Sequence, residues 1–229
     1  MKIIVNADDF GISTNVNRAI VSAIKDGYVT SSTILAVGDR VDEAVQMAKD
    51  LPQISFGVHL ALTDNFKSLS DGKPFNEKSW GYSRLNLFQL RAIVNEFSLQ
   101  IEKLQKSGIE ITHIDTHHHI HRFPLVLLAV IYVGKKYKIN KIRTQRLCHK
   151  RKLFNKIYRK IHNKLLQLFK FTTPNCYTDF LHLKEVDISN SNQTVEIMCH
   201  PGSQYSDERY FNKSFYSTFE SYLINYKNL

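Results

Sequence analysis

Ten consecutive residues, THIDTHHHIH at positions 112–121, contain five histidines and one aspartate. In an extended strand, successive side chains point to opposite faces. If this stretch is a strand, His118 points to one face, and the opposite face carries His113, Asp115, His117, His119 and His121. Imidazoles and a carboxylate are the ligands that many divalent metals take in proteins. The spacing therefore predicts a polar site that binds a metal ion, and it leaves open which imidazoles bind it.

The elements that would position these residues alternate along the chain. Short β-branched runs predict strands, and apolar residues at helical spacing predict helices. The expected strands span residues 2–7, 31–37, 54–60, 110–115, 141–143, 179–183 and 194–200, and the expected helices span residues 13–27, 39–50, 86–107, 123–137 and part of 206–227. This alternation predicts a mostly parallel sheet, either open or closed into a barrel. A polar loop after the third strand, with Gly72, Pro74 and Gly81, is long enough to be an active-site lid.

Polar residues end four of the expected strands. Asp8 and Asp9 end the first, His59 ends the third, the segment from Asp115 to His121 ends the fourth, and His200 ends the last. In parallel α/β folds the active site lies at the carboxyl ends of the strands. We therefore expect these side chains to meet in a single site.

One carboxylate and two imidazoles can bind a metal ion and leave positions open for water. Such an ion lowers the pKa of water toward about 7 and polarises a carbonyl oxygen. A second carboxylate can act as a general base, and another histidine can protonate the leaving group. The motif ADDF (7–10) supplies two adjacent carboxylates, and CHPG (199–202) supplies the additional histidine. Together these residues predict metal-assisted hydrolysis of an amide or ester.

The chain of 229 residues, 43% of them hydrophobic, suits a single α/β domain. Its three cysteines, Cys148, Cys176 and Cys199, are odd in number and lack C-x-x-C spacing, which predicts reduced thiols in a cytosolic protein. Asp8 and Asp9 interrupt the N-terminal apolar residues before these are long enough to form a secretory signal peptide. The longest apolar run, 125–133, is too short to cross a bilayer. We expect a cytoplasmic protein, at most peripheral to the inner membrane surface.

Four motifs resemble the signature blocks of the YdjC-type carbohydrate deacetylases, which include the chitooligosaccharide deacetylases. They are VNADDFG (5–11), GVHL (57–60), THIDTHHHIHRFP (112–124) and CHPG (199–202). Their order and spacing match the family over nearly the whole chain, and four blocks in register are far more specific than one. The resemblance implies a distorted (β/α) barrel related to the NodB-type polysaccharide deacetylases, formed as one domain over residues 1–229.

The resemblance also implies roles for individual residues. The metal ligands would be Asp9, His59 and His117, with Asp8 as the general base and His200 as the general acid. Asp115 and His119 suit contacts with substrate or with the metal ligands. Members of the family are commonly described with magnesium, whereas two imidazoles favour zinc, manganese or cobalt. We expect one divalent metal ion.

The segment 143–170 lies outside the four blocks and contains ten Lys or Arg residues and no acid, while the rest of the chain is nearly neutral. Within it, Leu153, Ile157, Ile161, Leu165 and Phe169 follow fourfold spacing, which predicts an amphipathic helix. We expect this apolar face to pack on the barrel and the basic face to be solvated. The alternative is contact with an anionic membrane surface or a lipid-linked glycan. Nucleic acid is not expected, because aromatic residues are not interleaved for base stacking. Arg143 should end a strand, either solvated or touching substrate.

The predicted function is removal of acetyl from an N-acetylated sugar, for example a chitooligosaccharide or another N-acetylglucosamine-containing glycan. One alternative is a metal-dependent phosphoesterase on a similar barrel. Another is a catalytically inactive sugar-binding protein, although the complete set of Asp8, Asp9, His59 and His117 argues against it. A homodimer is compatible with the family.

Overall fold

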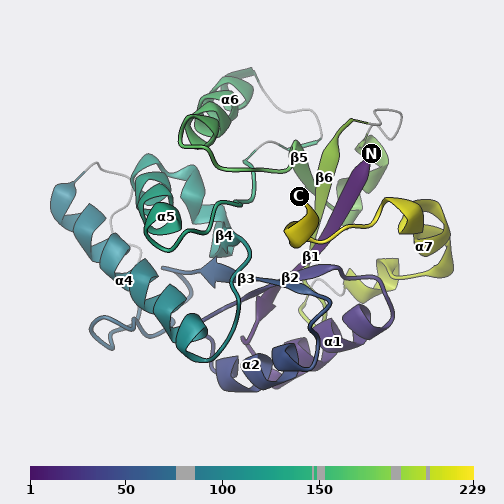
Figure 1. Ribbon diagram of the computed structural model, residues 1–229, viewed down its shortest axis with the longest axis horizontal. Helices are drawn as coiled ribbons and strands as arrows, with labels where there is room; N and C mark the ends of the chain where they lie inside the picture. Colours follow the sequence, from purple (N-terminus) through teal and green to yellow (C-terminus); the bar gives the residue numbers. More distant parts are fainter. Residues whose placement is uncertain (76–85, 146, 149–152, 187–191, 205–206) are drawn as a thin grey trace.

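The structure is a computed structural model that describes residues 1–229 except for 76–85, 146, 149–152, 187–191 and 205–206. Six parallel strands form one sheet in the order β4-β3-β2-β1-β6-β5 (Figure 1). The strands are β1 (Lys2–Phe10), β2 (Ser31–Ile34), β3 (Ser55–Leu60), β4 (Ile114–Thr116), β5 (Cys176–Asp179) and β6 (Thr194–Cys199). The curled sheet, a half-barrel surrounded by helices, confirms the predicted fold class.

The helices alternate with the strands in the sequence, and in space they lie on the outside of the curled sheet (Figure 1). The α-helices are α1 (Thr14–Lys25), α2 (Val41–Lys49), α4 (Leu87–Lys106), α5 (Pro124–Lys136), α6 (Leu153–Leu168) and α7 (Lys213–Phe219). The described 3₁₀ helices are η1 (His117–Arg122), η2 (Phe180–Glu185), η3 (Asp207–Tyr210), η4 (Glu220–Tyr222) and η5 (Tyr226–Asn228). Ser13 caps α1 by accepting a hydrogen bond from the Val16 amide, as its sequence position predicts.

The strands are buried almost throughout because both faces of the sheet are covered. Every residue of β2 and β3 is buried, and β1 is buried over most of its length. Helix α1 buries the apolar residues that recur at helical spacing, including Ile20 and Ile24. A large hydrophobic core holds the sheet and its helices together as a single domain, and a smaller cluster of Cys176, Val186 and Val195 lies at β5 and β6.

The predicted strand at 141–143 is reduced to isolated bridges at the edge of the sheet. Ile142 bridges to Ile114 of β4, and Leu147 bridges to Tyr177 of β5, at the opposite edge of the sheet. The segment around Arg143 thus passes from one edge of the sheet toward the other. The result is a distorted barrel.

Two other predicted elements take a different form in the structure, and a third lies partly outside the described residues. The strand expected at 179–183 begins earlier, at Cys176, and its predicted residues mostly form η2. The helix expected within 206–227 is broken into short helices. The chain after them crosses the amino ends of the strands. There the Ile224 amide donates to the Ile3 carbonyl, and the Tyr226 amide donates to the Ser31 hydroxyl. Gly81 of the predicted lid lies outside the described residues.

Helix α6 is present, but only part of its apolar face packs on the barrel. His162 and Leu166 are its buried side chains among those described, whereas Ile157 and Ile161 are 53% and 61% exposed. The expectation of burial is therefore wrong for Ile157 and Ile161, whereas Leu165 of the same row is half-buried and packs against the core. Hydrogen bonds to η1 orient the helix: His162 Nε2 lies 2.9 Å from the His121 carbonyl, and the Tyr158 hydroxyl donates to the Arg122 carbonyl.

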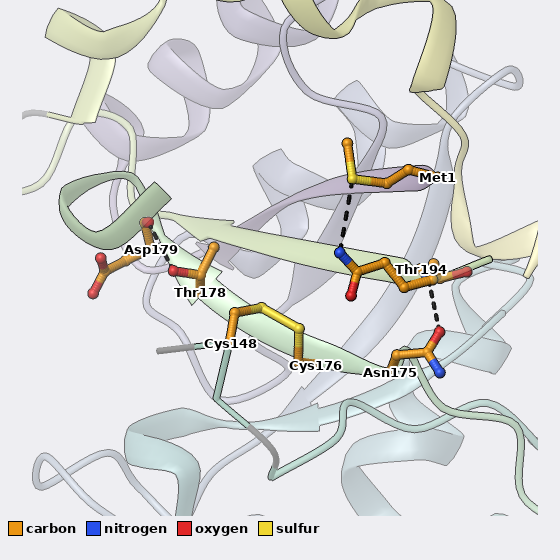
Figure 2. The surroundings of a disulfide bond; sticks show 8 residues. Met1, Cys148, Asn175, Cys176, Thr178, Asp179 and Thr194 are labelled. Atoms are coloured by element: carbon orange, nitrogen blue, oxygen red, sulfur yellow. Dashed lines mark hydrogen bonds between the residues drawn. A yellow bond between two sulfur atoms is a disulfide. The ribbon is translucent and has the colours of Figure 1, made fainter. Parts of the chain in front are cut away.

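The cysteines also correct the sequence-based expectation, because Cys148 and Cys176 form a disulfide (Figure 2). Their Cα atoms are 5.2 Å apart although 28 positions separate them in the sequence. The Cys148 amide donates to the Tyr177 carbonyl, and Leu147 bridges to Tyr177. This backbone pairing places Leu147 and Cys148 against β5. Sequence spacing cannot reveal this proximity. Cys199 is buried outside this disulfide, and its thiol donates to the Asn6 carbonyl at 3.4 Å.

None of the helices in the described part of the chain is both long and apolar enough to cross a membrane.

The disulfide predicts a specific thiol count. Alkylation of the unfolded, unreduced protein should modify one cysteine, Cys199, and alkylation after reduction should modify three, as measured by mass spectrometry. A Cys148→Ser variant should show two free thiols without reduction and lose about 3–4 kcal/mol of unfolding free energy, on the chain-entropy estimate for a loop of this length. Three reactive thiols in the unreduced wild type would contradict the pairing.

Candidate metal centre

Asp8 and Asp9 are adjacent in β1, yet both reach the carboxyl end of the sheet. The pairing of β1 with β2 changes register between Ala7 and Phe10, and Asp9 has φ 66°. In a regular strand the two side chains would point to opposite faces. An irregularity of this kind redirects a side chain. Asp9 consequently lies beside two histidines, and Asp8 is buried in the barrel interior.

Three potential metal-ligand atoms come together here: Asp9 Oδ1, His59 Nε2 and His117 Nδ1. The Asp9 oxygen lies 3.2 Å from the His59 nitrogen and 2.9 Å from the His117 nitrogen, and the two nitrogens are 3.3 Å apart. Ligand atoms at usual distances and angles around one zinc-like ion are about 2.8–3.6 Å from each other. All three separations fall within this range, and these are the three residues that the family resemblance assigns to the metal.

A carboxylate orients each of the two histidines. His59 Nδ1 lies 2.6 Å from Asp115 Oδ1, and His117 Nε2 lies 2.7 Å from Asp64 Oδ2. An ionised carboxylate only accepts hydrogen bonds, so in a neutral imidazole these nitrogens carry the proton. The opposite nitrogens then direct lone pairs toward Asp9 Oδ1. Histidines backed by carboxylates in this way are typical of metal sites.

Asp9 Oδ1 is itself buried, and no hydrogen-bond donor among the described residues is aligned with it. A buried charged oxygen without a donor is costly, and a cation at this point would satisfy it. The residues present therefore fit a divalent ion. Asp64, in the loop after β3, was missed in the sequence analysis because nothing in its spacing connects it with His117.

Two further groups of side chains lie close enough together to hold an ion, and both share a histidine with the first. One combines Asp64, His117 and His118, and the other combines Asp8, His59 and Asp115. The carboxylates of the second group are already paired with Arg143. In the group of Asp64, His117 and His118, the side chains of Asp64 and His118 are about half exposed, at 46% and 52%. The group containing Asp9 is thus the best candidate.

Arg143 lies behind the ligand atoms and is fully buried, so the expectation of a solvated side chain is wrong. Its Nη1 and Nη2 donate to the two oxygens of Asp8 at 2.6 and 2.7 Å, and Nη1 also lies 2.9 Å from Asp115 Oδ2. Its Nε donates to Glu196 Oε1 at 2.7 Å. The guanidinium therefore holds the predicted base and the partner of His59 in fixed positions, and direct contact with substrate is not needed to explain it.

Glu196 and Tyr226 complete this buried network, and neither was singled out from the sequence. The Tyr226 hydroxyl donates to Glu196 Oε2 at 2.6 Å, and its ring stacks on His113 with centroids 3.7 Å apart. Glu196 occupies an interior position of β6, a strand that otherwise reads as apolar. An acid within a buried strand was the available signal. Tyr226 offered none, because its position depends on the path of the C-terminal segment.

The electrostatic field of the site favours positive charge near His59. Burial acts to lower the pKa of His59, but the carboxylates of Asp115 and Asp9 raise it well above the usual value. Burial acts to raise the pKa of Asp8, but Arg143 holds it well below the usual value. Asp8 is therefore ionised at neutral pH. The field that favours a second proton on His59 also favours a metal cation beside it.

His200 directly follows β6 and faces Asp8 across the site. Its Nε2 lies 3.9 Å from Asp8 Oδ2, and its backbone amide donates to Asp207 Oδ2 at 2.7 Å. Burial acts to lower the pKa of His200, but hydrogen bonding to Asp207 and the charge of Asp8 raise it above the usual value. A raised pKa favours the protonated imidazole, which suits the role of proton donor.

The histidine-rich segment 112–121 is not one extended strand. β4 ends at Thr116 and the 3₁₀ helix η1 begins at His117, with positive φ values of 53° at His118 and 52° at His119. Side chains therefore alternate between two faces only as far as Thr116. His117 still reaches the candidate metal site, through the turn into η1.

The remaining histidines of the row are separated. His113 is buried under the site and lies 3.1 Å from Asn6 Oδ1, and His121 contacts Thr116 and Gln145. The His119 ring lies 5.3 Å from that of Tyr177, and burial together with the charge of Arg143 lowers the pKa of His119 to about 3.

Removing one hydroxyl should test the buried network. Tyr226→Phe deletes the donor to a fully buried carboxylate, so we expect a loss of about 1–3 kcal/mol in unfolding free energy, measured by urea denaturation. Tyr222→Phe is the matched control, because that side chain is 41% exposed and its change should stay within about 0.5 kcal/mol. Equal effects of the two substitutions would contradict the assigned hydrogen bond.

Comparisons with known proteins show which family this chain is similar to. The family model described as YdjC-like protein matches residues 2–222. A carbohydrate deacetylase from Clostridium beijerinckii is 30% identical over 95% of this chain and 87% of the relative, and one from Geobacillus stearothermophilus is 32% identical over 90% and 85%. A chitooligosaccharide deacetylase from Salmonella heidelberg is 29% identical over 87% and 81%.

The fold is also similar to that of a solved protein from Enterococcus faecalis V583, provisionally described as a cellobiose-phosphate cleavage protein. The TM-score is 0.73 at 25% identity, with 99% of this chain and 98% of that chain covered. The similarity in sequence and in fold extends over nearly the whole chain. The protein belongs to the YdjC-like family.

Proposed function

We propose that this protein is a metal-dependent carbohydrate deacetylase, an enzyme that hydrolyses the acetyl group from an N-acetylated sugar. The observation that carries the proposal is the convergence of Asp9, His59 and His117, with the ionised carboxylate of Asp8 beside them. The relatives named as carbohydrate and chitooligosaccharide deacetylases support it, since they match over most of their own length.

In this proposal Asp9, His59 and His117 hold one divalent ion. The ion supplies a Lewis acid, which polarises the acetyl carbonyl and makes water a better nucleophile. Asp115 and Asp64 keep the two imidazoles in the tautomer that binds the cation. Two imidazoles with one carboxylate favour zinc, manganese or cobalt, and the family resemblance points to magnesium.

The chain's own residues would carry the proton transfers. Asp8 accepts the proton of the attacking water, and Arg143 keeps its carboxylate ionised and correctly placed. His200 then donates a proton to the departing amine of the sugar. His119, largely buried near Tyr177, is assigned to substrate contact. The overall products are acetate and a sugar with a free amine.

The substrate class is the part of the proposal that an assay can test directly. Purified protein incubated with chitobiose-type oligomers and each of several divalent metals should release acetate, and the release should stop on addition of a chelator. Phosphate release from aryl phosphates without acetate release would instead support the phosphoesterase alternative. Binding of the sugar without release of either product would support an inactive sugar-binding protein.

The adjacent aspartates should behave differently when each is replaced. Asp8→Asn should retain metal and substrate binding while kcat falls by about 10²–10⁴-fold, because general base catalysis contributes about that much. Asp9→Asn should lose both metal and activity, with partial recovery in excess metal, because it removes a ligand. Metal content by mass spectrometry and acetate-release kinetics provide the two measurements.

His117→Ala and His118→Ala form a matched pair of controls for this experiment. The first removes a ligand atom and should empty the site, whereas the second removes a half-exposed ring and should leave the metal content near that of the wild type. Equal metal loss in Asp8→Asn and Asp9→Asn would mean that Asp8 is also a ligand. The general base would then have to be another residue, with His200 the first candidate.

A further inference from the structure

The outward face of α6 combines apolar and cationic side chains. Ile157, Ile161 and Leu168 are 53%, 61% and 75% exposed, and Lys160 and Lys164 are exposed beside them. At 3.6 residues per turn these five side chains lie within an arc of about 100°. An apolar ridge flanked by lysines on an outer helix is not explained by packing of the core.

The orientation of α6 is determined by its inner face. There, Leu166 and His162 are buried, His162 contacts the His121 carbonyl, and the Arg159 guanidinium donates to the Gln145 carbonyl at 2.7 Å. Rotating the helix to bury Ile157 and Ile161 would break these contacts. The apolar ridge is therefore left exposed by the fold.

Charge complementarity indicates what covers this ridge. The segment 143–170 contains all of the chain's excess positive charge, with ten Lys or Arg residues and no acid. A symmetric contact between two copies would place this patch against itself and oppose like charges. Nucleic acid would leave the isoleucines and Leu168 unused, since stacking needs aromatic side chains. An anionic lipid surface accepts both features, because lysines contact the headgroups while the apolar ridge enters the boundary with the acyl chains.

We propose that α6 docks the protein on the surface of an anionic lipid bilayer through Ile157, Ile161 and Leu168, with Lys160 and Lys164 contacting the headgroups. This inference is independent of the chemistry proposed for the metal site. It has a consequence for that site, because α6 rests on η1, which begins with His117. Docking would hold the candidate metal centre close to the lipid surface.

Co-sedimentation of the full chain with vesicles tests the proposal. Vesicles of phosphatidylcholine with about one third phosphatidylglycerol should bind the protein at 0.1 M salt at least tenfold more strongly than vesicles of phosphatidylcholine alone. Binding should weaken as salt is raised, because the lysine contribution is screened. Equal binding to the two lipid compositions, or to neither, would overturn the proposal.

Matched variants separate the apolar and the cationic contributions. The double variant Lys160→Glu, Lys164→Glu should lower binding to the anionic vesicles at least tenfold. The control Lys25→Glu, Lys49→Glu changes the net charge by the same amount at exposed positions on α1 and α2. It should lower binding much less. Ile157→Ser with Ile161→Ser should also weaken binding, whereas Leu87→Ser with Phe88→Ser, at exposed positions on α4, should not.

Unchanged melting temperatures would show that the variants are folded, since all substituted side chains are exposed. Light scattering provides the remaining measurement. If Ile157→Ser with Ile161→Ser lowers the molar mass in solution without changing vesicle binding, the ridge is a contact between copies of the chain and the proposal is wrong.

Discussion

A single buried guanidinium connects the strands that carry the candidate active site. Arg143 contacts Asp8 on β1, Asp115 on β4 and Glu196 on β6. Removing a charged group from water costs several kcal/mol unless charge pairing and hydrogen bonds compensate for it. Because these three strands are not all neighbours in the sheet, the network requires the sheet to curl around Arg143. The curvature of the half-barrel and the geometry of the site are thus consequences of one interaction.

The charge of this interior also explains why its open end attracts a cation. Asp8, Asp115 and Glu196 surround one guanidinium, and Asp9 lies nearby beside His59 and His117. The four acids leave an excess of negative charge, even though burial raises the pKa of Glu196. In a poorly solvated interior such an excess is strongly unfavourable. The raised pKa of His59 is one response to it, and a divalent ion between Asp9, His59 and His117 is another. Metal binding and the folding of the interior would therefore be coupled.

The two ends of the barrel have different roles that the same network connects. The carboxyl end presents the candidate metal ligands, and the amino end is covered by the C-terminal segment, which sends Tyr226 inward. From there, hydrogen bonds pass through Glu196 and Arg143 to Asp8. Tyr226, three positions before the last residue, thus contributes to placing the proposed general base. Helix α6, by contrast, packs outside this network against η1 and presents its apolar ridge outward.

The strands of the parallel sheet and most of its helices could be predicted from the sequence, because apolar periodicity and helix caps such as Ser13 are local properties. The meeting of polar side chains from the ends of β1, β3 and β4 could be anticipated for a related reason, since the carboxyl ends of parallel strands meet at one edge. The choice of Asp9, His59 and His117 among them came from the family resemblance. The partners of these residues could not be predicted. Asp64, Glu196, Tyr226 and the disulfide between Cys148 and Cys176 depend on how distant segments approach one another.

The errors about Arg143 and α6 have the same physical origin. An arginine is usually solvated, but here three carboxylates from separate strands make burial favourable. An apolar row on a helix usually faces the core, but here polar contacts of His162 and Tyr158 with η1 determine which face is turned inward. Local pattern specifies which elements form and where their polar ends lie. Long-range packing and charge pairing specify which side chains become partners, because those energies exist only once the segments have come together.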